Sequence, residues 1–256
     1  MRSAARRSIA ALTACCFALS ESVIARAGPI DISPVTVTLT PPARVAQITI
    51  QNPSDQPLRI QVSGFAWTDA ADGSIEMTPA QDIIVFPQLV TIPPLGTQQI
   101  RAAIMSPAGA VERTYRILLD VLPPLSGTDQ LSGPGVELSI RTRFTIPIFQ
   151  EPLVRRMSGE IATAAANGGK LKFTIVNSGN AHLGGDEIRI IGRNNAGGVV
   201  FSYPFRGWYV LIDGKRAFFV DVPQAGCRDV RSLTIAPSPE MSVPPKKIEV
   251  EGVCGG

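Results

Sequence analysis

A long alternation of apolar and polar residues between positions 135 and 152 constrains the fold of this chain more than any other feature. A period of two predicts a β-strand, because successive side chains of a strand point to opposite faces. At about 3.3 Å per residue, residues 136–149 would span about 45 Å, well beyond a typical strand. One face carries Val136, Leu138, Ile140, Thr142, Phe144, Ile146 and Ile148, and the other carries Glu137, Ser139, Arg141, Arg143 and Thr145.

The proline within this segment indicates how the strand is placed. Pro147 has no backbone N–H, so its strand cannot be hydrogen-bonded on both sides at that position. Two interpretations follow from the residues alone. The segment is either an edge strand whose free side serves another protein, or a long hairpin strand buried in its own domain.

The rest of the chain predicts an all-β protein. Its 256 residues include 22 prolines and 23 glycines, and no long apolar run has the 3.6-residue period of a helix. Hydrophobic residues make up 45% of the chain, which is enough to bury a core. About seven short strand-like runs before residue 123 fit an immunoglobulin-like β-sandwich.

Residues 1–27 have the features of a cleavable signal peptide. Arginines precede an apolar run at residues 9–19, and Ala25-Arg26-Ala27 matches an A-x-A cleavage site. The run is too short to span a bilayer, and no later segment reaches about 18 apolar residues. We therefore expect no direct membrane insertion of the mature protein.

The mature chain would carry no net charge. Cleavage removes four of the 24 basic residues and one of the 21 acidic residues, which leaves 20 of each. This balance argues against a nucleic-acid partner, because nucleic-acid binding needs a cationic surface.

Cys227 and Cys254 are the cysteines that remain after cleavage of the signal peptide. In an exported protein they predict a disulfide, with two free buried thiols as the alternative.

The composition changes at residues 151–156, which we interpret as a linker between a domain at 28–152 and a domain at 153–256.

Pro34 interrupts the first strand, so that strand lies at an edge or switches sheets. The polar turn at residues 52–57 predicts a hairpin between its flanking strands. A strand followed by asparagine and a polar turn occurs at 47–52 and again at 171–177, which suggests two sandwiches of similar plan.

Residues with catalytic or metal-binding chemistry are sparse. His182 is the sole histidine and sits in a turn sequence, so we interpret it as a surface residue. Asp69, Asp72 and Glu76 lack the ligand set of a calcium loop and fit a solvated hairpin better. The sequence therefore predicts no catalytic residue, no enzyme activity, no metal and no cofactor.

Five short motifs follow one another along both halves of the chain. They are Leu95-Gly-Thr-Gln-Gln-Ile-Arg101, Tyr115-Arg-Ile-Leu-Leu-Asp-Val-Leu-Pro-Pro124, Phe144-Thr-Ile-Pro-Ile-Phe-Gln-Glu-Pro152, Asn177-Ser-Gly-Asn-Ala-His182 and Gly207-Trp-Tyr-Val-Leu211. Their order resembles that of the periplasmic pilus-assembly chaperones of the chaperone–usher pathway, and the third motif is more similar to the archaic or alternative branch of that family.

The resemblance implies two immunoglobulin-like domains in an L-shaped or boomerang arrangement. It also implies a periplasmic protein that binds, folds and caps pilus subunits by donor-strand complementation and delivers them to an outer-membrane usher. The donor strand would be residues 136–149, and its apolar side chains would enter the groove of an incomplete subunit. Those side chains are Val136, Leu138, Ile140, Phe144 and Ile146.

The chain departs from the family at the cations that hold the carboxylate of the subunit's C-terminus. The family has an arginine and a lysine where this chain has Thr36 and Pro147. Arg116 and Arg101 are the candidate replacements, because each lies in an otherwise apolar strand where an unpaired guanidinium is unfavourable. The alternative for each is an ordinary surface or salt-bridged arginine.

Two other classes of function remain open at this stage. A pilin or adhesin subunit would also be an exported sandwich, but it should lack its own final strand. A ligand-binding module would need a polar or aromatic cluster, and Trp67 and Trp208 are the only tryptophans available.

Overall fold

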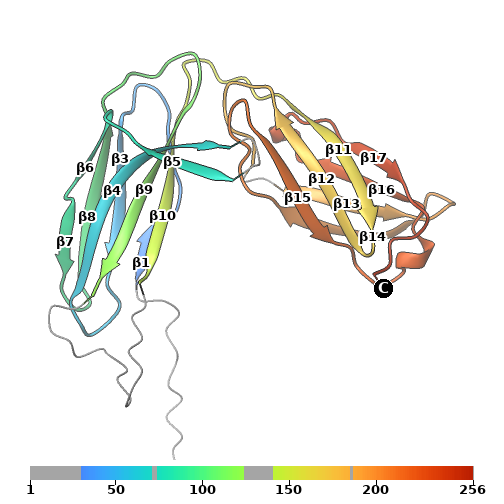
Figure 1. Ribbon diagram of the computed structural model, residues 1–256, viewed down its shortest axis with the longest axis horizontal. Helices are drawn as coiled ribbons and strands as arrows, with labels where there is room; N and C mark the ends of the chain where they lie inside the picture. The colour runs from blue at the N-terminus through green and yellow to red at the C-terminus, as the bar shows by residue number, and fades with distance from the viewer. Residues whose placement is uncertain (1–29, 71–73, 124–140, 185–186, 256) are drawn as a thin grey trace, which may run out of the picture.

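The chain forms two β-sandwiches that meet at an angle, in a computed structural model that describes residues 30–70, 74–123, 141–184 and 187–255 (Figure 1). Its described elements are strands and two short 3-10 helices, and no described helix has the length and apolarity needed to cross a membrane. The prediction of an all-β chain with two immunoglobulin-like sandwiches in a bent arrangement is confirmed.

The first domain contains strands β1 to β10 in two sheets. One sheet has the order β1-β3-β8-β6, and the other has the order β2-β10-β9-β4-β5, with β7 paired to β4. The strands are β1 (Asp31–Ser33), β2 (Val37–Leu39), β3 (Val45–Gln51), β4 (Leu58–Asp69), β5 (Ile75–Pro79), β6 (Ile83–Phe86), β7 (Leu89–Ile92), β8 (Thr97–Ile104), β9 (Arg113–Leu122) and β10 (Arg143–Gln150).

The start of the first domain switches between its two sheets, as Pro34 predicted. β1 pairs with β3 in one sheet, and β2 pairs with the end of β10 in the other. The predicted hairpin around residues 52–57 is wrong, because β3 and β4 belong to opposite sheets. The polar turn crosses between the sheets instead of closing a two-stranded ladder.

The second domain contains strands β11 to β17, also in two sheets. Their orders are β11-β12-β15 and β14-β13-β16-β17. The loop at residues 194–198 joins β13 to β14, and the Asn194 side chain accepts a hydrogen bond from Gly198 N. The strands are β11 (Gly159–Asn167), β12 (Lys170–Asn177), β13 (Glu187–Arg193), β14 (Val199–Arg206), β15 (Lys215–Asp221), β16 (Ser232–Pro237) and β17 (Lys246–Glu249).

Two buried asparagines explain the internal similarity between the domains. The Nδ2 atom of Asn52 donates to Gln56 O, and that of Asn177 donates to Ala181 O, in each case four residues further on. Each asparagine also accepts, through Oδ1, a hydrogen bond from the backbone N–H two residues further on. A buried asparagine thus organises the turn after β3 and the turn after β12, because it satisfies backbone groups that would otherwise lack partners.

Each sandwich has its own hydrophobic core between its two sheets. Alternate residues of β3 and β8 face the first core, where Ile48, Ile50 and Ile100 are fully buried. The second core is built around Phe173, which stacks on Phe218 at 5.3 Å between ring centroids. Separate cores mean that contacts between the domains have to come from other residues.

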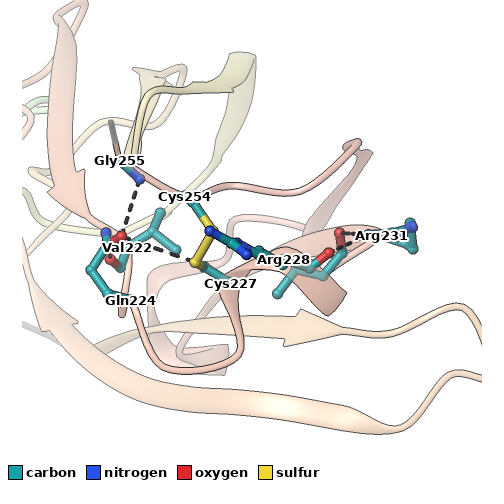
Figure 2. Close-up of a disulfide and its surroundings, with 8 residues drawn as sticks. Val222, Gln224, Cys227, Arg228, Arg231, Cys254 and Gly255 are labelled. Carbon is teal, nitrogen blue, oxygen red and sulfur yellow. Dashed lines mark hydrogen bonds between the residues drawn. A yellow bond between two sulfur atoms is a disulfide. The ribbon is translucent and has the colours of Figure 1, made fainter.

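The disulfide between Cys227 and Cys254 links a 3-10 turn to the end of the chain (Figure 2). Gln224 lies beside it and joins the same two segments, because its side chain donates to Val222 O and accepts from Gly255 N. The predicted pairing is therefore present in the structure.

Replacing both cysteines with serine is expected to destabilise the second domain by about 3–4 kcal/mol. A bridge across a sequence separation of 27 residues restricts the unfolded chain, and the cost of losing it follows from loop closure. Urea unfolding of the wild type and of the Cys227→Ser/Cys254→Ser variant measures the change. Detection of two free thiols in unreduced, unfolded protein would contradict the prediction.

Candidate functional site

The strand predicted to serve a partner has a free edge in the structure. β10 pairs with β9 along its whole length, from Arg143 opposite Asp120 to Gln150 opposite Arg113. Its other side meets β2 only at residues 148–150. Among the described strands, residues 143–147 therefore have a partner on one side alone, and Pro147 lies at the end of that free stretch.

The apolar face of β10 turns into its own domain. Ile146 is 2% exposed and Ile148 is fully buried in the first core, and the half-buried Phe144 packs against the same core. The prediction that Ile146 offers its side chain to a partner is wrong, because this end of the strand completes the inner face of its own sheet. Three other candidates, Val136, Leu138 and Ile140, lie outside the described residues.

An aromatic cluster joins the two domains. Trp67 from β4 and Phe149 from β10 are buried against Leu211 of the second domain, with Tyr209 packed beside them. The Tyr209 ring lies 4.9 Å from Phe149 and 6.4 Å from Trp67 between centroids. β4 contributes Trp67 to these contacts, and the β4–β5 hairpin projects from the first sandwich toward the second (Figure 1).

Arg116 lies next to this cluster, on the strand that pairs with β10. It is 5% exposed and stands opposite Pro147 in the β9–β10 ladder. Its guanidinium lies 4.0 Å from the ring centroid of Trp67 and 5.5 Å from that of Trp208. This cage explains how a cation can be buried here, since the faces of the indole rings attract it.

The hydrogen bonding of Arg116 is incomplete. Nη1 donates to Thr145 Oγ1 at 3.3 Å, but Nε and Nη2 are buried without a hydrogen-bond partner among the described residues. Burial lowers the pKa of the guanidinium, and the nearby charge of Arg216 lowers it further. A buried cation with free donors is the arrangement expected of an anion-binding residue.

The second candidate, Arg101, lies elsewhere. It is exposed on β8 in the opposite sheet, between Gln47 and Phe86 in register. The structure therefore does not bring the two candidate arginines together. Thr36, which the sequence resemblance aligns with the family's arginine, faces the second domain, because its hydroxyl lies 3.2 Å from that of Tyr209.

A buried ion pair connects the tip of the β4–β5 hairpin to the second domain. Asp69 has a side chain only 1% exposed and accepts a hydrogen bond from Arg216 Nη2 at 2.5 Å. It also accepts a hydrogen bond from Leu211 N at 3.1 Å. The sequence placed Asp69 in a solvated hairpin, whereas the structure gives it partners 142 and 147 residues away.

His182 forms a second polar contact between the domains. His182 is 8% exposed. Glu112 accepts a hydrogen bond from the backbone N of His182 at 3.0 Å, and the second carboxylate oxygen of Glu112 lies 2.8 Å from His182 Nδ1. Its ring stacks on Phe149 with centroids 3.8 Å apart. The interpretation of His182 as a surface residue is therefore wrong, because the turn that carries it is buried against the first domain.

The same turn is fastened to the linker through Asn180. The Nδ2 atom of Asn180 donates to Ala110 O and Val154 O, and its Oδ1 atom accepts from Arg156 N. The sole histidine and this asparagine thus hold the domain boundary. No local pattern in the sequence indicates either role, since both residues are typical of exposed turns.

A cavity of about 330 Å³ lies along the domain boundary. It is lined from the first domain by Trp67, Asp82, Glu112 and Tyr115, among others, and from the second by Leu211 and Ile212. Tyr115 donates to Asp82 Oδ2 at 2.6 Å, and burial together with this carboxylate raises the tyrosine pKa far above its ordinary value. Among the described residues no three His, Cys, Asp or Glu side chains gather as a metal site.

Comparison with known proteins relates this geometry to one family. Residues 29–154 match the family model for the N-terminal domain of PapD, described as a pili and flagellar-assembly chaperone. No curated protein matches the chain in a sequence comparison.

Solved chaperone structures have a similar fold. The CsuC–CsuE chaperone–tip adhesion subunit complex, from archaic chaperone–usher Csu pili of Acinetobacter baumannii, matches with a TM-score of 0.53 and 15% identity over 87% of this chain and 98% of the other. The class 5 fimbriae chaperone CfaA matches with a TM-score of 0.51 and 16% identity over 82% and 92%. The chaperone YadV matches with a TM-score of 0.52 and 13% identity over 87% and 100%. At these identities the match shows a common fold.

Proposed function

Because this chain belongs to the family of pili and flagellar-assembly chaperones, which its residues 29–154 match, we propose that its chaperone function in pilus assembly works by donor-strand complementation. In this mechanism the segment that leads into β10 fills the groove of a subunit that lacks a strand. The partner is a pilin or tip subunit, and the apolar donors are Val136, Leu138, Ile140 and the outer part of Phe144.

The free edge of β10 at residues 143–147 is the observation that carries this proposal. An edge strand offers unpaired backbone groups, and an added strand gains affinity from the backbone and specificity from alternate side chains. The alternative of a pilin or adhesin is not favoured, because β10 already completes the first sandwich. A complex with a similar fold contains a chaperone and a tip adhesion subunit.

The proposal includes a location and a second partner. A signal peptide at residues 1–27 would direct the protein to the periplasm, and an outer-membrane usher would receive the loaded subunit. Assignment to the archaic or alternative branch stays a prediction from the sequence.

Arg116 is the proposed anchor for the carboxylate at the C-terminus of the subunit. It lies opposite Pro147, the position where the family has a cation, so a guanidinium from the neighbouring strand replaces that cation. Its two free donors match the two oxygens of a carboxylate, and it stands beside the stretch of β10 that has a free edge.

Replacing Arg116 with alanine is expected to weaken subunit capture by about ten- to a hundredfold. Loss of a charge-assisted hydrogen bond costs about 1.5–3 kcal/mol, which corresponds to one to two decades in affinity. The test is to co-express each protein with the subunits of a chaperone–usher pilus and to identify the captured subunit. Titration of the variant and of the wild type with that subunit then gives the two affinities.

Arg101→Ala is the matched control, because it removes the same side chain from an exposed site on the opposite sheet. Its capture should equal that of the wild type. Equal capture by Arg116→Ala, with unchanged thermal unfolding, would refute the role of Arg116 as anchor.

A further inference from the structure

Trp208 is an exposed aromatic residue at the boundary between the domains. It comes from the second domain, in the segment between β14 and β15, and is 47% exposed. The Arg116 guanidinium lies 5.5 Å from its ring centroid, and the Tyr209 ring centroid lies 5.7 Å from it. The other tryptophan of the chain, Trp67, is only 1% exposed. Tryptophan is highly buried on average and is enriched at interfaces, so a half-exposed indole ring is a candidate for a surface that a partner covers.

The backbone that carries Trp208 is held in place. Two residues further on, Val210 N donates to Leu183 O at 2.7 Å and Val210 O accepts from Leu183 N at 2.9 Å. Val210 O also accepts from Asn177 Nδ2 at 3.0 Å. Gly184 has a φ of +123° and passes so close that a β-carbon on it would lie 3.0 Å from Trp208 O. Trp208 is therefore presented by a constrained segment, which lowers the ordering entropy that a contact would cost.

Arg116 connects Trp208 to the free edge of β10. Its Nη1 atom donates to Thr145 Oγ1 at 3.3 Å, and Thr145 lies in the stretch 143–147 that has a partner on one side alone among the described strands. The same guanidinium lies beside the Trp208 ring. The edge strand of the first domain and the indole of the second domain therefore border one side chain.

A strand added to this edge would place side chains close to Trp208. The added strand would lie about 4.8 Å from β10, and every second side chain on it would share the sheet face that carries Thr145. Thr145 points away from the core, since its neighbours Phe144 and Ile146 pack into that core. The outer face of the added strand thus lies on the side where Arg116 meets Trp208.

We propose that Trp208 is a subunit-binding residue of the second domain, whose exposed ring packs against an apolar or aromatic side chain of the subunit strand paired with β10. This inference rests on the proposed function, which supplies the subunit. A cationic side chain is unfavourable there, because the Arg116 guanidinium already lies over the ring. An indole offers one hydrogen-bond donor and is otherwise apolar, so an apolar or aromatic side chain is the chemistry that fits it.

The contact would give the second domain a direct part in recognition. Covering the Trp208 ring removes apolar surface from water, and it also removes water from the neighbouring Arg116 guanidinium. Exclusion of water strengthens a charge-assisted hydrogen bond made by that guanidinium. Tryptophan is enriched among the residues that dominate binding energy, and such residues lie where water is excluded.

Acrylamide quenching of tryptophan fluorescence tests the contact directly. The wild type and Trp208→Phe are measured free and in complex with the subunit identified by co-expression, and the difference between the two proteins isolates the signal of Trp208. The buried Trp67 and any tryptophan of the subunit cancel in this difference. The Trp208 signal should be quenched in the free protein and protected in the complex. Equal quenching in both states overturns the contact.

Trp208→Ala is expected to weaken subunit binding by about tenfold, as for a tryptophan in the core of an interface. Phe86→Ala is the matched control. It removes an aromatic side chain that is 73% exposed and stands opposite Arg101 in register, on the sheet that does not contain β10. The affinity of this control should equal that of the wild type, and thermal unfolding of each variant shows that the fold is intact.

The Arg116→Ala background separates a contact with the subunit from an effect that passes through Arg116. If Trp208 touches the subunit, Trp208→Ala weakens binding further in that background. If Trp208 only positions the guanidinium, the second substitution has no further effect, and the contact is overturned.

The inference and the proposed function fail in different ways. If the wild type captures a subunit and Trp208→Ala binds it equally well, Trp208 is not a contact and the proposed function stands. If the wild type captures no subunit in co-expression, the proposed function fails and the inference fails with it.

Discussion

Replacing Leu138 and Ile140 with aspartate is expected to abolish subunit capture while the protein still folds. In donor-strand complementation these side chains enter an apolar groove, where an unpaired carboxylate is strongly unfavourable. The part of the alternation that the described structure places in the first core is Phe144, Ile146 and Ile148, so the two substitutions should spare that core. Co-purification with subunits measures capture, and thermal unfolding measures the fold.

Ser139→Asp is the matched control for the single change Leu138→Asp. It introduces the same charge one residue away, on the opposite face of the alternation, and should leave capture intact. If the double variant still holds soluble subunit, this strand is not the donor. If Ser139→Asp impairs capture as strongly as Leu138→Asp, the assignment of faces is wrong.

Replacing Asp69 with alanine is expected to lower the free energy of unfolding by about 3–5 kcal/mol. Removal of one partner from a buried ion pair leaves the other charge without compensation, and here the Arg216 guanidinium would lose its carboxylate. Leu211 N would lose its acceptor as well. Urea unfolding of the variant and the wild type gives the difference.

A second substitution tests this explanation. In Asp69→Ala/Arg216→Met the unpaired cation is replaced by an apolar side chain of similar length, so part of the lost stability should return. Arg216→Met is also measured alone, in the wild-type background. If it lowers the free energy of unfolding by the same amount there as in the Asp69→Ala variant, the two residues act independently. The electrostatic explanation would then be refuted.

Local patterns in the sequence predicted much of the fold. The alternation at residues 136–149 identified β10, and Pro34 identified the switch between sheets, because both signals depend on neighbouring residues. The similarity around Asn52 and Asn177 reflected a shared way of closing a turn. The pairing of Cys227 with Cys254 followed from the absence of any other cysteine after the signal peptide.

The domain boundary could not be predicted in the same way. His182 and Glu112 are 70 residues apart, and Asp69 and Arg216 are 147 residues apart, so no local pattern links them. Turn residues are usually exposed, and that rule failed where the turns of one domain are packed against the other. A cation inside an apolar strand is conspicuous in a sequence, and that signal selected both Arg116, which is buried beside the domain boundary, and Arg101, which is exposed on the opposite sheet. The role of Arg116 as anchor stays a prediction.

The prediction for Ile146 failed for a different reason. A period of two shows which side chains share a face, but it does not show what covers that face along the strand. The apolar face of β10 lies against its own core at Ile146 and Ile148. A continuous apolar face in the sequence therefore does not show whether the strand's own domain or a partner covers it.

The place of β10 between β9 and β2 also decides how the molecule carries a mechanical load. Tension from a captured subunit would act along the strand axis, so the eight residue pairs with β9 are sheared together rather than peeled apart one by one. The three pairs with β2 hold the far end of the strand. The pull is thus borne first by the ladders of the first sandwich, and it reaches the second domain through Phe149, which β10 contributes to the aromatic cluster.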